Sequence, residues 1–373
     1  MSKKEKLFFM FLIFMSIARN DGVPIPKILS LFFIVCGALC WSLLMFGSDY
    51  TKTERFIQVF LLGIAVVSVI QNHHLGTLLA AMVIVGMKDI SLKRALVVIV
   101  CILTAVLAFN AVIFMAGILS GNGPSGYYQQ RNVMGIFDIE KQYRVYFGIL
   151  HPNGSQKVVC LISMLILYLN YKFLRLRHVV LLSIVNCAFY MITFSNTGLL
   201  LWFLSVLIIY LLKTHEEWEK CVGKMIPPVY ILMLAVVLYC TFFYSESSII
   251  AILNRWLTGR LSLANQYIRA MGMSIWGQNV SSALGGLDLD CAYVNLLLSY
   301  GCIVFFSYCA GVFGLLICLY HKRKYLDMVL LMLLHCFFVL ESFIMVVYMN
   351  WTFIYMGMCL YESLSPKRIV GND

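Results

Sequence analysis

Residues 95–119 read ALVVIVCILTAVLAFNAVIFMAGIL, an apolar run without a single charged side chain. A helix needs about 20 such residues to cross the hydrocarbon core of a bilayer, so this run alone predicts a membrane-spanning helix. The whole chain has the same character. Of its 373 residues 62% are apolar and 12% are charged, and the mean hydropathy is +0.89. Soluble proteins have roughly 45 to 50% apolar and 25% charged residues, so the composition predicts an integral membrane protein.

Apolar stretches fill most of the chain. Backbone groups in lipid must be bonded internally, and no alternating strand pattern is apparent, so helices are the expected solution. We predict an all-α, polytopic membrane protein with about 12 transmembrane helices in a single domain, residues 1–373. The stretches run approximately over 7–18, 28–46, 56–70, 75–87, 95–119, 146–171, 179–194, 197–212, 225–244, 292–319, 326–348 and 350–364.

The first stretch allows two interpretations. Three lysines precede residues 7–18, as in a signal peptide, but no small-residue cleavage site follows, since Ser16-Ile17-Ala18 leads directly into Arg19. We therefore expect a retained helix.

Two long polar loops interrupt the apolar pattern, at 120–146 and at 245–291. If the N-terminus is cytoplasmic, most of the 28 lysines and arginines fall in short turns on that same side. This distribution predicts that both termini are cytoplasmic and that both long loops face outward. The net charge of +11 is then a consequence of topology and does not indicate nucleic-acid binding.

The thirteen cysteines are scattered through apolar stretches, as small packing residues are. We predict no disulfide, no metal site and no cofactor. Asp288-Leu289-Asp290 has the D-x-D form of soluble sugar-nucleotide transferases, but no nucleotide-binding domain accompanies it. One of these carboxylates remains a candidate base.

The first outer loop carries Arg131 and Arg144 and leads to His151-Pro152-Asn153. Pro152 suits the first turn of a helix that continues to Tyr171. The amino end of such a helix favours phosphate, because its N–H groups are unpaired and its dipole is positive there. A simple capping turn explains the same residues equally well.

The second outer loop carries Arg255 and Arg260 in the stretch 253–264, for which we predict a short amphipathic helix lying on the membrane. The planar guanidinium fork suits phosphate, and Gly259 permits close approach of a ligand to Arg260. Contact with lipid headgroups is the alternative for each arginine.

Two ionisable residues, His335 and Glu341, fall inside the apolar stretch 326–348. Such residues are costly in a membrane and usually line a cavity. We expect this of Glu341, whereas a lone intramembrane histidine is more often a packing residue.

Several short motifs occur in an order that resembles Wzy-type polysaccharide polymerases of the O-antigen polymerase and ligase superfamily. They are RVYFGILHPN (144–153), TFSNTGLL (193–200), LNRWLTGRLSLA (253–264), SIWG (274–277), LDCAY (289–293) and YG (300–301). Two positions depart from the pattern. Asn196 stands where many relatives have arginine, which puts a role for that turn in question, and Cys291 stands where asparagine commonly follows the aspartate, which bears on the orientation of Asp290.

The resemblance implies a membrane glycosyltransferase that joins oligosaccharide repeat units, carried on undecaprenyl diphosphate, into capsular polysaccharide or exopolysaccharide. It would act at the outer face of a bacterial plasma membrane, with a flippase and a chain-length regulator as possible partners and with no cofactor. The implied catalytic candidates are His151, Asp290 and Glu341. The implied substrate-binding candidates are Arg131, Arg144, Asn153, Arg255 and Arg260.

Two other functions fit a polytopic protein of this kind. A ligase of the same superfamily would transfer the finished glycan to a different acceptor. A flippase or transporter of lipid-linked oligosaccharide would be expected to show internal repeats and charges at mid-membrane, and no convincing repeat is present.

Overall fold

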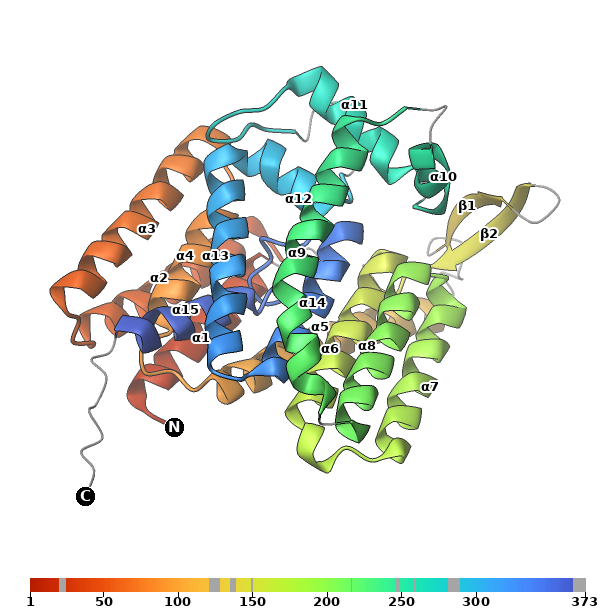
Figure 1. The fold of residues 1–373 in the computed structure, drawn as a ribbon. Coiled ribbons are helices and arrows are strands. Elements are labelled where there is room, and N and C mark those ends of the chain that lie inside the picture. Colours follow the sequence, from red (N-terminus) through yellow and green to blue (C-terminus); the bar gives the residue numbers. More distant parts are fainter. Residues whose placement is uncertain are drawn as a thin grey trace. The chain divides into compact units, whose positions relative to one another are not determined.

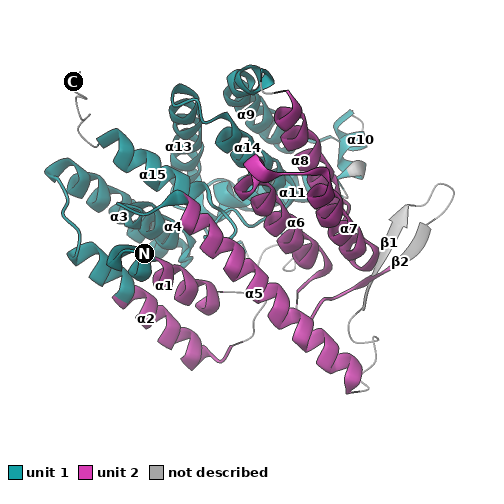
Figure 2. Cartoon of the chain, turned by 90° about the horizontal axis from the view of Figure 1, so that it is seen from below, with its two compact units in different colours: residues 1–8, 40–92, 217–373 teal, residues 9–39, 93–216 magenta. Residues whose placement is uncertain are grey.

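The computed structural model describes residues 1–19, 25–120, 128–134, 139–148, 150–215, 217–245, 249–257, 259–280 and 289–364. Helices make up most of this part of the chain (Figure 1). The chain forms two compact units, which Figure 2 distinguishes by colour. Unit 1 comprises residues 1–8, 40–92 and 217–373, and unit 2 comprises residues 9–39 and 93–216.

Unit 2 is built around α6, which packs against both α7 and α8. A polar cluster buried between these helices fixes their pairing: Asn186 donates to the Ser163 hydroxyl at 2.9 Å, and Gln156 donates to the Asn186 carbonyl at 3.3 Å. The elements of unit 2 are α5 (Leu92–Leu119), β1 (Tyr128–Met134), β2 (Ile139–Val145), α6 (Pro152–Leu169), η2 (Tyr171–Phe173), α7 (Leu176–Thr193) and α8 (Asn196–Thr214).

Unit 1 has a core in which α9 packs on α13 and α14, while α4 packs on α3 and α15. Its elements are α3 (Lys52–Asn72), α4 (Gly76–Gly86), α9 (Trp218–Phe242), α10 (Ile249–Trp256), α11 (Arg260–Met271), α12 (Ala292–Asn295), the π-helical turn η4 (Leu296–Tyr300), α13 (Gly301–His321), α14 (Tyr325–Leu340) and α15 (Thr352–Leu364). Two further helices, α1 (Lys3–Ala18) and α2 (Lys27–Phe46), contribute residues to both units.

Seven helical segments of the described chain are long and apolar enough to cross a membrane. They are α2, α3, α5, α7, α8, α9 and the continuous segment Ala292–His321. The structure therefore indicates a multi-pass membrane protein, whereas the predicted number of 12 spans is not confirmed. Every predicted stretch contains a helix, but α4 and α15 have only 11 and 13 residues. At 1.5 Å per residue, helices of this length are too short to cross about 30 Å of hydrocarbon.

The predicted continuous span 326–348 is wrong, because α14 ends at Leu340. Glu341 has an extended backbone, and residues 341–351 turn irregularly before α15 begins. The fully buried side chain of Asn350 holds this turn together. Its amide donates to the Ile344 carbonyl at 2.6 Å and to the Tyr308 hydroxyl at 3.2 Å, and its oxygen accepts from the Thr352 backbone N–H. Irregular backbone is tolerated at membrane depth only inside protein, where such partners exist.

Both long loops contain more regular structure than the sequence predicts. In the first loop, β1 and β2 form an antiparallel hairpin with Tyr128 opposite Val145. In the second, the helix predicted over 253–264 is instead two helices, α10 and α11. Gly259 separates them with a φ of 84°, which an L-residue rarely adopts.

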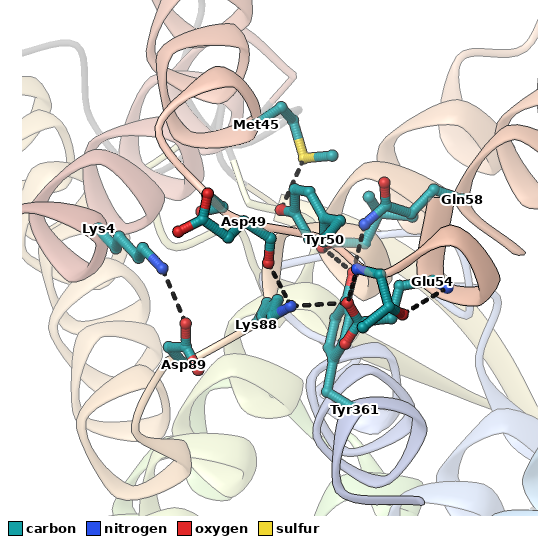
Figure 3. A network of polar contacts seen from close by, with 12 residues as sticks. Lys4, Met45, Asp49, Tyr50, Glu54, Gln58, Lys88, Asp89 and Tyr361 are labelled. Atoms are coloured by element: carbon teal, nitrogen blue, oxygen red, sulfur yellow. Dashed lines mark hydrogen bonds and ion pairs between the residues drawn. The ribbon is translucent and has the colours of Figure 1, made fainter. Parts of the chain in front are cut away.

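A polar network anchors the start of α3 within unit 1 (Figure 3). Thr51 and Glu54 form a capping box at the first turn. Lys88 donates to the Glu54 carboxylate at 2.7 Å and to the Asp49 carbonyl, and its ammonium lies 4.8 Å from the centre of the Tyr50 ring. Glu54 is 4% exposed, so its charge depends on Lys88 for compensation.

Replacing Glu54 tests this network. We expect Glu54→Gln to lower the free energy of unfolding by up to about 3 kcal/mol, less than for a fully buried pair because Lys88 is still 17% exposed. The matched control is Asp89→Asn, which breaks the exposed pair with Lys4 and should cost about 1 kcal/mol or less. Thermal unfolding in detergent measures both. Equal losses in the two variants would contradict the assignment of Glu54 to a buried pair.

Candidate functional site

Three of the predicted site residues meet in unit 1 and are called the Arg260 cluster: Arg260, Asp290 and Glu341. Arg260 donates from Nε to Asp290 Oδ2 at 2.9 Å and from Nη2 to Glu341 Oε1 at 3.1 Å. The side chain of Arg260 is 11% exposed and that of Glu341 is 7% exposed, whereas Asp290 is 39% exposed. The cluster therefore has a buried side at Glu341 and an accessible side at Asp290.

The break between α10 and α11 places Arg260 at the first position of α11. Asn254, on α10, acts as the cap of α11 in place of Gly259, which has no side chain. Its Oδ1 accepts from the backbone N–H groups of Leu261 and Ser262 at 3.0 and 3.1 Å. Its amide donates to the Tyr244 hydroxyl. These bonds satisfy the unpaired donors of the helix start and thereby fix the backbone from which Arg260 extends.

A second asparagine attaches α11 to α9. Asn265 is 4% exposed and donates to the carbonyls of Thr241 and Phe242 at 2.8 and 3.3 Å. These carbonyls belong to the last turn of α9, where no intrahelical donor remains for them. The helix that carries Arg260 is consequently held against a membrane-spanning helix.

Asp290 immediately precedes Cys291, the residue that caps the start of α12. Cys291 is 4% exposed, and burial raises the pKa of its thiol. The thiol therefore stays protonated at neutral pH and serves as a small packing group next to Asp290, consistent with the predicted packing role of the cysteines.

Glu341 is positioned through its neighbour Ser342. The Asn295 amide, on α12, donates to the Ser342 hydroxyl, and the Ser299 hydroxyl donates to Asn295 Oδ1. The segment that begins at Glu341 is thus tied to the same short helix that Asp290 precedes. Asn254, Asn295 and Ser342 were not among the predicted site residues. Their only signal in the sequence is that they are polar residues beside apolar runs.

The π-helical turn η4 lies directly after Asn295 and contacts segment 274–278 of the second long loop. Gln278 N–H donates to the Leu298 carbonyl at 3.2 Å, and Cys302 N–H donates to the Ser274 carbonyl at 2.9 Å. Gly277 and Gly301 have φ values of 92° and 90°, and the backbones meet at these two residues. A Cβ built on Gly277 would lie 2.3 Å from the Ser299 carbonyl oxygen. The motifs SIWG (274–277) and YG (300–301), which are far apart in the sequence, therefore contact each other through their backbones.

The chemistry of the Arg260 cluster follows from its charges and its free donors. One guanidinium and two carboxyl groups carry a formal net charge of −1. Arg260 uses two of its five N–H donors on these carboxylates, and the other three have no partner among the described residues. The cluster can therefore present an oriented carboxylate, Asp290, next to free guanidinium donors.

Four of the predicted site residues lie in unit 2: Arg131, Arg144, His151 and Asn153. Those whose side chains the structure describes take part in contacts within the unit. His151 caps α6, because its Nδ1 accepts from the Asn153 backbone N–H at 3.3 Å, and Pro152 occupies the first helical position. Both the helix start and the capping turn proposed for these residues are confirmed. His151 remains exposed and lies edge-on to the Tyr146 ring. Arg131 lies in β1, and its side chain falls outside the described part of the structure.

Arg144 is only 2% exposed and is engaged on both sides. Its Nε donates to the Thr193 carbonyl at 2.7 Å, and its Nη2 donates to Asn153 Oδ1. It thus joins the end of α7 to the start of α6. This geometry gives Arg144 and Asn153 a structural role, and their role as diphosphate ligands stays a prediction.

The Arg144 contacts can be tested by a conservative change. We expect Arg144→Lys to lower the free energy of unfolding by about 1–3 kcal/mol, because a single ammonium group cannot replace both donors and leaves one buried acceptor unsatisfied. Thermal unfolding in detergent measures the loss. Arg255→Lys on the exposed end of α10 is the matched control, and an equal loss there would contradict the structural role.

The remaining candidates differ in their surroundings. Arg255 is exposed and has no ion pair within the described residues. His335 is 1% exposed, so the packing interpretation fits its burial. Asp288 falls outside the described residues.

Comparisons with known proteins give no relative on which to base a function. No protein-family model, no curated protein and no solved structure matches the chain.

Proposed function

We propose that the protein is a membrane glycosyltransferase that polymerises lipid diphosphate-linked oligosaccharide repeat units at the outer face of a bacterial plasma membrane. The observation that carries this proposal is the Arg260 cluster, in which one arginine of a polar loop orients two acidic residues beside membrane-spanning helices. Motifs that resemble Wzy-type polymerases contain Arg260 and Asp290. The carrier is undecaprenyl diphosphate by that resemblance, and the orientation with both termini cytoplasmic follows from the basic turns.

The proposed reaction assigns different tasks to the members of the cluster. Asp290, the accessible carboxylate, accepts the proton of the acceptor hydroxyl as its oxygen bonds to the anomeric carbon of the donor. The bond from that carbon to the diphosphate oxygen breaks, and the lipid diphosphate leaves with the bonding electrons. Glu341 stays buried and holds Arg260 in place.

The net charge of the cluster limits what Arg260 can contribute to diphosphate binding. A cluster with net charge −1 does not by itself attract an anion, so Arg260 alone is a poor diphosphate site. Its three free N–H donors stabilise the leaving group only together with further cations. Arg255 on α10 is exposed and unpaired within the described chain, so we assign it as the principal electrostatic partner of the diphosphate.

The test replaces the chromosomal gene with an Arg260→Lys allele. Lysine cannot span both carboxylates as the guanidinium does, so we expect short surface glycans and accumulation of single-repeat lipid carrier, measured by gel electrophoresis and lipid mass spectrometry. Arg269→Lys, on the exposed last turn of α11, is the matched control and should leave polymer length unchanged.

Two outcomes would identify a different function, and a third would exclude the Arg260 cluster. Long polymer that accumulates on the lipid carrier would identify a ligase, because polymerisation then precedes the missing step. Repeat units that remain on the cytoplasmic leaflet would identify a flippase. Normal polymer in an Arg260→Lys strain with normal protein levels would remove the cluster from the mechanism.

A further inference from the structure

A groove with a volume of about 550 Å³ lies within unit 1 and is lined by residues of α3, α4, α13 and α15. Most of the lining residues are apolar or small. They include Ile57, Leu61 and Ile64 of α3 and Gly311 and Gly314 of α13. Both α3 and the segment that contains α13 are long and apolar enough to cross a membrane. The groove therefore lies at the depth of the lipid hydrocarbon.

The groove is open along α13. Gly314 is exposed, and a Cβ built on it would have no atom within 4 Å. The lining residues of α13 extend from Val304 to Cys318, a length of about 21 Å at 1.5 Å per residue. One leaflet accounts for about half of the 30 Å hydrocarbon core, so the groove is long enough for a single lipid chain.

One buried hydroxyl at this groove has no hydrogen-bond partner within the described residues. It belongs to Thr77, which lines the groove in the first turn of α4 and is 6% exposed. Threonine hydroxyls in helices commonly bond the carbonyl four residues earlier, as Thr241 does with Val237 at 2.8 Å. The residue four before Thr77 is His73, which lies outside α4 with a left-handed φ of 61°. Because a buried hydroxyl without a partner is costly, we expect a bound molecule to supply the acceptor.

Thr77 lies close to the end of a membrane-spanning helix. The helix α3 ends at Asn72, and residues 73–75 lead directly into α4, which packs against α3. With 21 residues, α3 is about as long as the hydrocarbon core is thick, so its end lies near the boundary with the lipid headgroups. The ester carbonyls of phospholipids lie at this boundary and accept hydrogen bonds.

We propose that the groove binds one acyl chain of a membrane phospholipid and that the Thr77 hydroxyl donates to the ester carbonyl at the head of that chain. Lipid tails are as apolar as the groove, so burial alone gives no preference for the groove over the bilayer. Close packing and the Thr77 bond supply that preference. An isoprenoid carrier ends in a diphosphate, which calls for a basic side chain, and none of the described lining residues is basic. This inference does not depend on the proposed transferase function.

Photo-crosslinking of the full-length protein in phosphatidylcholine nanodiscs tests the position of the chain. The probe is phosphatidylcholine with a diazirine in one acyl chain, and mass spectrometry locates the crosslinks. We expect Gly314→Leu to lower crosslinking to Ile84 and Leu360, which line the groove on other helices, several-fold. Gly63→Leu is the matched control, because a Cβ there also meets nothing within 4 Å but faces away from the described lining residues. Crosslinks to Leu43 of α2, which is 60% exposed, are the internal reference.

A second probe tests the contact at the head of the chain. The dialkyl ether analogue carries the same diazirine but lacks the ester carbonyl. In the unaltered protein we expect the ester probe to crosslink Ile84 and Leu360 several-fold more than the ether probe, relative to Leu43. Thr77→Val keeps the shape of the side chain and removes the hydroxyl, so it should abolish this difference. Thermal unfolding in detergent verifies that each variant is folded.

Three results would overturn the proposal. Equal crosslinking by the two probes in the unaltered protein would exclude the Thr77 bond to the carbonyl. Unchanged crosslinking in Gly314→Leu would show that the chain does not enter the groove. Displacement of the ester probe by undecaprenyl phosphate, but not by unlabelled phosphatidylcholine, would assign the groove to an isoprenoid carrier instead.

Discussion

Asp290→Asn is expected to stop chain extension almost completely while leaving the protein folded. The amide keeps an oxygen for the Arg260 N–H, so the geometry of the Arg260 cluster survives, but it cannot accept the proton of the acceptor hydroxyl. General-base catalysis contributes about 10²–10⁴-fold to a rate, and we expect a loss of this size in polymer formation. Asp290 is the member of the cluster with the accessible side chain, at 39% exposed, so it is the one that substrate can reach.

The comparison with Glu341→Gln distinguishes catalysis from positioning. Glu341 is 7% exposed and contacts Arg260 from the buried side, so its amide variant should retain most of the activity. Chain-length distributions and lipid-linked intermediates measure both variants at matched protein levels. If Glu341→Gln abolished polymer while Asp290→Asn did not, the roles of the two carboxylates would be exchanged. Full-length polymer in both variants would exclude either residue as the base.

The second large effect is expected from Gly277→Ala. The added Cβ would lie 2.3 Å from the Ser299 oxygen and 2.7 Å from the Tyr300 carbonyl carbon, both backbone atoms that cannot rotate away. A φ of 92° is also unfavourable for alanine. We expect a loss of about 1–3 kcal/mol from backbone strain and about 1–3 kcal/mol more from the clash. The variant should accumulate poorly and unfold at a lower temperature.

Gly272→Ala is the matched control for this substitution. Gly272 has a φ of 67°, yet nothing lies within 4 Å of the position that an added Cβ would occupy, so only the strain of the backbone applies. Thermal unfolding of the two variants in detergent separates the contributions. Similar losses in both would show that the contact between segment 274–278 and η4 does not hold the loop to the helix.

The membrane class and the approximate positions of most helices were predictable because they depend on local composition. An apolar run such as 95–119 has no stable alternative to a helix in lipid, whatever its neighbours are. The start of α6 at Pro152 was also predictable, since proline fixes φ and lacks the N–H that a first turn leaves unpaired. The hairpin of β1 and β2 was not, because few apolar residues mark its pattern in the sequence.

For the candidate site, the identity of the residues was predictable, whereas their association was not. Arg260 was predicted as a loop arginine, Asp290 from a short motif, and Glu341 as a charge inside an apolar stretch. Their association could not be read from positions 30 and 81 residues apart. It depends on α14 ending at Leu340, where Glu341 bonds Arg260 and Asn350 replaces the lost helical bonds. Arg144 was predicted to bind substrate, but in the structure its guanidinium is bonded to Thr193 on one side and to Asn153 on the other.

The amino-acid sequence alone determined that this chain is a helical membrane protein with two polar, arginine-bearing segments, because hydropathy is a sum over neighbouring residues. The tertiary structure alone decided which charges are compensated, which helices stop inside the apolar stretches, and which glycines bring two backbones together. These properties depend on hydrogen bonds between residues far apart in the chain, and a one-dimensional pattern does not record distance in space.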